Sequence, residues 1–266
     1  MIDDGLFEKF PKPDVILGQH VNPAPAGTLS WRQGVVMAAS DSLQIRLFGR
    51  GAHGSMPQAS IDPVVMAASL VMRLQTIVSR EIAPADSAVL TVGSLQAGTK
   101  ENVIPQEAVM KLNVRSLRDE VRQHLLDAIR RIANAEAEAS AAPQSPEITV
   151  LDRYSLLKND ADPAERVVDA FRQDFPADCI SQLDAPVMAS EEFGCYGSQW
   201  HAPSFFWFIG GTNPSVYAQA EKAGTIAALP ANHSPKFAPV LQPTLETGIK
   251  ALVVAGCAWL SQPATS

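Results

Sequence analysis

The stretch SLQIRLFG at residues 42–49 alternates apolar and polar side chains as a half-buried strand does, and DPVVMAASLVMRLQTIVSR at residues 62–80 carries the apolar stripe of a helix. Four further segments with strand or helix periodicity follow, namely AVLTVGSLQAG (88–98), EAVMKLNVRSL (107–117), RDEVRQHLLDAIRRIANAEAEA (118–139) and EITVLDRY (147–154). The order βαββαβ predicts a ferredoxin-like split unit over about residues 41–154.

The segments on either side of this unit have a different pattern. DVILGQHV at residues 14–21 predicts a buried strand that carries His20 at its C-terminal edge, where ligands usually bind in α/β sheets. After residue 155 we expect a polar helix near 163–173, an apolar strand at 204–211 and a final helix near 244–260. The sequence therefore predicts an α/β protein in which residues 1–40 and 155–266 belong to one domain, with residues 41–154 inserted between them.

Composition excludes several classes of function. The chain has 266 residues, 46% of them hydrophobic, and a formal charge of −7, so we expect a globular protein that does not bind nucleic acid. No apolar run approaches the roughly 20 residues needed to span a bilayer, and the acidic N-terminus lacks the features of a signal peptide. Three scattered cysteines are too few for a disulfide framework, so we expect a cytoplasmic protein without a membrane partner.

Two familiar catalytic motifs do not explain this sequence. Gly49, Gly51 and Gly54 have the spacing of a dinucleotide fingerprint, but Pro57 falls where its helix should already be established. No acidic residue follows about 20 positions later to hold a ribose. The chain also has no GxSxG elbow and hence no visible serine nucleophile.

The five histidines are more informative. His124 lies on the charged side of a predicted helix, and His201 has no acidic or histidine neighbour in sequence, so both are most simply structural or solvated residues. His20 and His233 each lie at the edge of an element beside Gly or Pro, and His53 is flanked by small residues that leave room for a ligand. Taken singly, each of these three is also explained by a structural role.

The strings GQHV, GRGAHGSMP, TKENVIP, NVRS, SEEFG and NHSPKF occur in this order along nearly the whole chain. Together with the βαββαβ insertion they resemble the dinuclear metal amidohydrolases of the hippurate hydrolase, indole-acetyl-amino-acid hydrolase and carboxypeptidase G type. The resemblance implies a two-metal, aminopeptidase-like catalytic domain that is interrupted by a lid and dimerisation domain. It also implies hydrolysis of the amide bond of N-acyl amino acids or related small amides, within a homodimer.

Individual roles follow from the same resemblance. His20 and His233 match residues that bind the two divalent ions, and imidazole suits zinc or manganese without fixing which. His53 matches the lid histidine that reaches the partner's active site and stabilises the oxyanion. Asn102 and Arg115 match lid residues that bind the substrate carboxylate, a role for which an arginine fork is well suited.

The chain also departs from the family pattern. The general base and further metal ligands of the family lie upstream of GQHV, but only about 19 residues precede His20 here. The resemblance therefore implies that this chain corresponds to the C-terminal portion and is inactive alone. Glu191 and Glu192 resemble an active-site loop, and we assign them no catalytic role. The alternative is a non-catalytic remnant that dimerises and binds a small carboxylate.

Overall fold

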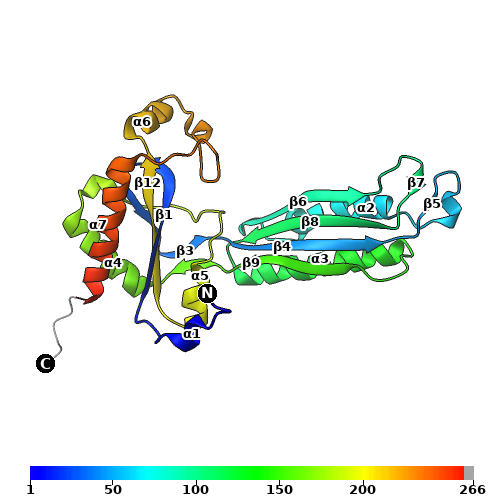
Figure 1. Cartoon of the computed structure of the whole chain (residues 1–266), viewed down its shortest axis with the longest axis horizontal. Helices are drawn as coiled ribbons and strands as arrows, with labels where there is room; N and C mark the ends of the chain where they lie inside the picture. Colours follow the sequence, from blue (N-terminus) through cyan, green and yellow to red (C-terminus); the bar gives the residue numbers. More distant parts are fainter. Residues whose placement is uncertain (261–266) are drawn as a thin grey trace. The chain divides into compact units, whose positions relative to one another are not determined.

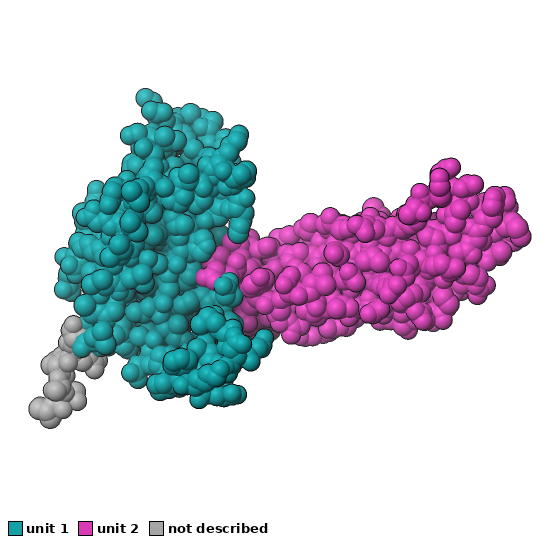
Figure 2. Space-filling view, viewed as in Figure 1, with its two compact units in different colours: residues 1–36, 157–187, 192–266 teal, residues 37–156, 188–191 magenta. Residues whose placement is uncertain are grey.

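The computed structural model describes residues 1–260, so the last six residues of the expected 155–266 segment lie outside it. The chain forms two compact units (Figure 2). Unit 1 comprises residues 1–36, 157–187 and 192–266, and unit 2 comprises residues 37–156 and 188–191. Because the chain leaves unit 1 and returns to it, unit 2 is an insertion.

Unit 2 has the predicted βαββαβ order. Its elements are β4 (Ala39–Phe48), α2 (Pro63–Thr76) continued by a π turn (Ile77–Glu81), β6 (Ala88–Ala97), β8 (Glu107–Ser116), α3 (Asp119–Ala139) and β9 (Glu147–Tyr154). The strands form one antiparallel sheet in the order β6-β8-β4-β9. Both helices cover the same face of this sheet (Figure 1). A two-stranded extension, β5 (Ala52–His53) paired with β7 (Val103–Ile104), was not predicted.

Alternation along β4 separates the core of unit 2 from the open face of its sheet. Leu43, Ile45 and Leu47 are buried beneath the helices, while the residues between them are only half-buried. On the open face, Arg46 is paired with Glu107 of the neighbouring strand at 2.6 Å. The open face is therefore polar, as expected for an antiparallel sheet that is covered on one side.

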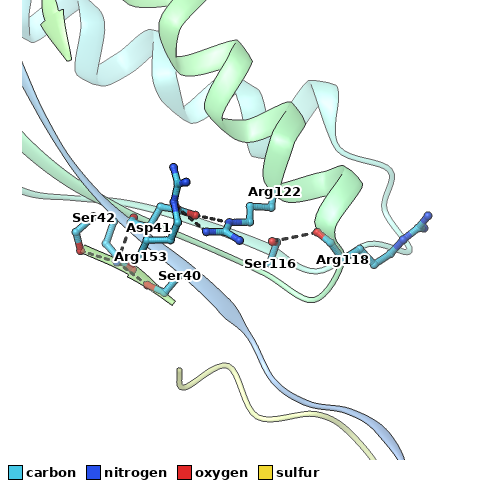
Figure 3. Close-up of polar contacts among 8 residues, drawn as sticks. Ser40, Asp41, Ser42, Ser116, Arg118, Arg122 and Arg153 are labelled. Atoms are coloured by element: carbon cyan, nitrogen blue, oxygen red, sulfur yellow. Dashed lines mark hydrogen bonds and ion pairs between the residues drawn. The ribbon is translucent and has the colours of Figure 1, made fainter. Parts of the chain in front are cut away.

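One carboxylate lies among the core residues of unit 2. The Asp41 side chain is fully buried and accepts two hydrogen bonds from Arg122 of α3, at 2.6 Å from Nε and 2.9 Å from Nη2 (Figure 3). Arg153 of β9 donates a third at 3.0 Å. The hydrogen bond to Asp41, opposed by burial, raises the pKa of Arg122. This cluster joins the first strand of the unit to its last helix and last strand.

Unit 1 contains a mixed sheet in the order β1-β12-β2-β11. Its strands are β1 (Ile16–Pro25), β12 (Ser204–Thr212), β2 (Leu29–Trp31) and β11 (Ile180–Gln182). β1 runs parallel to β12, whereas β2 is antiparallel to β12. The strand pair β3 (Gly34–Met37) and β10 (Leu157–Asn159) lies outside this sheet. The helices are α1 (Leu6–Lys9), α4 (Ala161–Asp174), α5 (Gly194–Trp200), α6 (Pro214–Lys222) and α7 (Leu241–Leu260), with short 3-10 turns at Ala177–Cys179 and Ile226–Ala228.

Alternation along β1 decides which way its side chains point. Gln19 accepts a hydrogen bond from the Trp207 indole at 3.0 Å and donates one to the Gly248 carbonyl of α7 at 3.1 Å. It therefore faces the core formed with α4 and α7, which pack on one side of the sheet (Figure 1). Since successive strand residues point to opposite faces, His20 lies on the other face. On that face, a Cβ at Gly18 would lie 2.5 Å from the Phe193 ring, so no larger residue fits.

No helix within residues 1–260 combines the length and the apolar character needed to cross a membrane.

Candidate functional site

Two of the three histidines of unit 1, His20 and His233, lie at one end of its sheet, where a single carbonyl group bonds to His20 and to the residue before His233. The His20 Nδ1 atom is 2.6 Å from the Val21 carbonyl oxygen, and the Asn232 side-chain amide donates to the same oxygen at 2.9 Å. Asn232 is followed directly by His233, whose backbone has a left-handed φ of 69°. The NHSPKF loop is thus held against the strand that carries His20, and both imidazoles are exposed.

The hydrogen bond of His20 defines which ring nitrogen is available to a ligand. A carbonyl oxygen can only accept, so Nδ1 must carry the proton. In the neutral ring, Nε2 then has the lone pair that binds a metal ion. A backbone carbonyl that orients an imidazole in this way is the usual outer partner of a metal-binding histidine.

Within residues 1–260, no group of three or more His, Cys, Asp or Glu side chains lies close enough together to hold a metal ion. The metal ligands that the resemblance implied in unit 1, His20 and His233, are both imidazoles. Their chemistry suits zinc well and manganese less well, since manganese favours oxygen ligands.

His53 has the opposite tautomer to His20. The backbone N–H of Ser55 donates to His53 Nδ1 at 3.1 Å, and the Ser55 hydroxyl lies 2.7 Å from the same nitrogen. Because a backbone N–H can only donate, Nδ1 is an acceptor and the neutral ring carries its proton on Nε2. The exposed His53 side chain therefore presents an N–H donor.

Asn102 lies beside His53. His53 pairs with Val103 in the β5–β7 ladder, and the Gly54 backbone N–H donates to the Asn102 carbonyl at 2.8 Å. A Cβ at Gly54 would be 3.0 Å from that carbonyl oxygen, so glycine permits this close approach. The structure thus brings together two of the three predicted lid residues, in the extension beyond the end of β4.

Arg115 lies at the other end of the same sheet. Arg115 of β8 pairs with Ser40 at the start of β4, whereas the extension that carries His53 follows Phe48 at the end of β4. The eight residues from Ser40 to Phe48 span about 27 Å of strand. The Arg115 guanidinium donates to the Asn113 carboxamide oxygen at 3.1 Å, the Met188 carbonyl at 2.8 Å and the Ser190 hydroxyl at 3.1 Å. Its Nη2 makes no hydrogen bond within the described chain and remains available for a ligand.

Asn113 and Asn232 were not singled out from the sequence. Asn113 donates through its amide to the hydroxyls of Ser40 at 2.8 Å and Ser42 at 3.1 Å, which fixes the side chain that Arg115 contacts. Their positions in the sequence could have indicated both residues. Asn113 lies two residues before Arg115 in the string NVRS, and Asn232 directly precedes His233 in the string NHSPKF.

The two remaining histidines have structural surroundings. His124 Nε2 lies 3.3 Å from Glu81, and His201 ends α5 with a left-handed φ of 51°. The pKa of Glu81 is lowered, chiefly by its hydrogen bond from Arg131.

Comparison with known proteins agrees with this architecture. Residues 39–141 match the peptidase dimerisation domain. Hippurate hydrolase of Campylobacter jejuni is 36% identical over 198 residues, which cover 74% of this chain and 51% of that protein. The chain belongs to the M20 family of dinuclear metal peptidases and amidohydrolases.

Solved structures share the fold of this chain. A putative aminohydrolase from methicillin-resistant Staphylococcus aureus superposes with a TM-score of 0.76 at 25% identity, covering 96% of this chain and 60% of that one. A dinuclear metal-binding peptidase of the M20 family from Bacillus subtilis gives a TM-score of 0.67 at 23% identity, with 97% and 59% covered. The chain spans about half the length of the curated relatives that it matches.

Proposed function

We propose that this chain contributes to a metal-dependent amidohydrolase that cleaves the amide bond of N-acyl amino acids or related small amides. The observation that carries the proposal is the arrangement of His20 and His233 at one edge of the unit 1 sheet, with His20 Nε2 left as a lone-pair donor. The relatives support the reaction class, since hippurate hydrolase and N-acetyldiaminopimelate deacetylases are among them.

His20 and His233 would hold divalent metal, zinc or manganese. When bound, such an ion polarises a carbonyl oxygen and lowers the pKa of a water molecule to near 7. The residues of unit 2 would act on the substrate: His53 donates from Nε2 to the developing oxyanion, and Asn102 and Arg115 bind the free carboxylate. Losing one oxyanion donor typically lowers kcat by about 10²- to 10³-fold.

We further propose that the remaining ligands and the general base come from polypeptide beyond residues 1–266. Two features of unit 1 support this. β1 is a ten-residue edge strand and is paired in parallel with β12, and parallel strands are normally covered on both faces. Beside it, α7 exposes Leu245, Ile249 and Val253, each more than half accessible, at helical spacing. An edge strand next to an apolar helix face is a surface that a further strand and helix would cover.

Titration with zinc tests the proposed metal ligands. Zn²⁺ is expected to shift the ring Cε1–H resonances of His20 and His233 together, and His20→Ala should remove most of the shift at His233 because one imidazole binds weakly. His124→Ala is the matched control, since that ring lies on α3 beside Glu81 and should leave the zinc response unchanged. Independent shifts of the two rings, each unaffected by loss of the other, would contradict a shared site.

We also propose a homodimer formed through unit 2. β6 is an edge strand, and on the adjacent helix α2 Val65 and Met72 are among the most exposed apolar side chains. Pairing two copies of β6 about a two-fold axis would be antiparallel. Val89 pairs with Arg115 near the start of β6, so antiparallel pairing brings the His53 end of one sheet toward the partner's Arg115. This arrangement would bring His53 of one chain toward Arg115 of the partner, although the two residues are far apart within a single chain.

Light scattering on the full chain is expected to give the mass of a dimer at micromolar concentration. The double substitution Val65→Glu and Met72→Glu should produce monomers, because it places charge in the apolar part of the interface. Val150→Glu on the opposite edge strand β9 is the matched control and should leave the dimer intact. A monomeric, folded wild-type chain would remove the basis for His53 acting across subunits.

The three cysteines form no disulfide, which suits the reducing cytoplasm that we propose as the location.

A further inference from the structure

A cavity of about 640 Å³ lies next to the histidine pair, entirely within unit 1. Its lining includes Asn22, two residues after His20 on the same strand face, and Ala231, two residues before His233. Ser30 of β2 contributes to one wall and Tyr217 of α6 to another; α6 lies beyond the carboxyl ends of β1 and β12 (Figure 1). The volume falls in the range of small-molecule sites.

The cavity contains polar groups that no part of the described chain satisfies. Ser30 is 7% exposed, and its hydroxyl makes no hydrogen bond within residues 1–260. The Tyr217 hydroxyl and the Asn22 amide N–H groups also have no acceptor among these residues. These polar atoms are open to the cavity and are available to hydrogen-bond a ligand. The rest of the lining is largely apolar, including Pro23, Leu183 and Leu229.

The charge of the lining restricts the ligand. Lysine and arginine are absent from it, and Asp178 is its one charged residue. A carboxylate would be desolvated there without a cation to pair with and would be repelled by Asp178. The cavity therefore suits an uncharged group with an apolar body and a hydrogen-bonding atom.

We propose that this cavity binds the uncharged acyl group of the substrate, in preference to its carboxylate end. The inference rests on the proposed amidohydrolase function and adds the substrate class: acyl groups of aromatic or branched size, which fill a space of this volume better than acetyl does. Ser30, Asn22 and Tyr217 supply the hydrogen bonds, while the apolar walls remove the acyl group from water.

Cys179 gives a residue-resolved readout, because it is half-buried in the cavity wall. Burial and the neighbouring Asp178 raise the pKa of its thiol, so alkylation is best followed at pH about 9. Benzamide or N-benzoylglycine should slow iodoacetamide labelling of Cys179 by a factor of 1 + [L]/Kd, about tenfold at ten times Kd. Labelling of Cys257, which is exposed on α7, should not change.

Two variants and one control substitution make the site assignment specific. Ser30→Ala should weaken binding of benzamide by about 2- to 10-fold through loss of one hydrogen bond. Ala227→Trp should abolish ligand protection of Cys179 by filling the cavity, whereas Ala228→Trp, one residue outside the lining, should retain it. An unchanged far-ultraviolet circular dichroism spectrum and melting temperature establish that the variants are folded.

The proposal is overturned if benzamide gives no protection up to its solubility limit, if glycine protects Cys179 as well as benzamide does, or if Ala227→Trp leaves protection intact. Zinc titration of His20 and His233 is independent of this cavity. A normal titration with no protection of Cys179 would therefore refute the acyl site alone, while loss of both would refute the proposed function.

Discussion

Replacing Asp41 with asparagine is expected to destabilise unit 2 by about 3 to 5 kcal/mol, since it removes one partner of a buried ion pair. The Asp41 carboxylate is fully buried and accepts hydrogen bonds from both Arg122 and Arg153. Asparagine keeps the shape but carries no charge, so the Arg122 guanidinium, whose side chain is 15% exposed, is left without its counterion. A neutral amide also presents one oxygen where two are required.

The effect can be assigned to unit 2 because all four tryptophans, at positions 31, 200, 207 and 259, lie in unit 1. In urea, Asp41→Asn should lower the transition seen by far-ultraviolet circular dichroism and leave the tryptophan transition in place. Asp127→Asn is the matched control, because Asp127 is 60% exposed and forms a surface pair with Arg130. Such pairs contribute about 0 to 1 kcal/mol. Equal effects of the two substitutions would refute a structural role for the cluster.

The helices and long strands of unit 2 were predictable from the sequence, whereas this cluster was not. Leu43, Ile45 and Leu47 alternate over a whole strand, and Val121, Leu125, Ile129 and Ile132 repeat at helical spacing, so local periodicity is enough. Asp41 lies directly before the predicted strand at residues 42–49, and aspartate is a residue type that is common in turns. Its partners are 81 and 112 residues away in sequence, and no local pattern reports them.

Unit 1 was less predictable for a related reason. Its sheet depends on strands of three residues, such as β2 and β11, that are too short to show a period. The parallel partner of β1 begins at Ser204, and only the fold brings these segments together. The sequence did predict the strand that carries His20 but placed its end near Val21, whereas β1 continues to Pro25. Proline is tolerated there because β1 is an edge strand.

The candidate site shows the same division. Short sequence strings were enough to name His20, His53 and His233 as site residues. The tautomers of His20 and His53 depend on the carbonyl that His20 donates to and on the N–H that donates to His53, and only the folded structure shows these partners. For Arg115, the sequence suggested a guanidinium fork open to a carboxylate. The structure shows two of its three nitrogens already bonded to Asn113 and to residues 188–190, some 75 positions away. A ligand would therefore meet Nη2.

The second large expected effect is a low rate of substrate hydrolysis by residues 1–266 alone. A catalytic zinc ion normally requires about three protein ligands and an open position, and the described chain offers two imidazoles at its sheet edge. A general base contributes about 10²- to 10⁴-fold to the rate. We therefore expect residues 1–266 alone to hydrolyse N-acyl amino acids at least about 10²-fold more slowly than a relative such as the Campylobacter jejuni hippurate hydrolase.

The most direct test is to purify residues 1–266, add zinc, manganese or cobalt in turn, and assay N-benzoylglycine and a panel of N-acetyl amino acids. Glu191→Gln and Glu192→Gln, which neutralise the two carboxylates of the SEEFG loop, are assayed in parallel. We expect turnover indistinguishable from that of the added metal alone, for the wild-type chain and for both variants. Metal-dependent turnover that either substitution abolishes would show that this chain carries its own base, and would contradict the proposal that catalysis requires polypeptide beyond these residues.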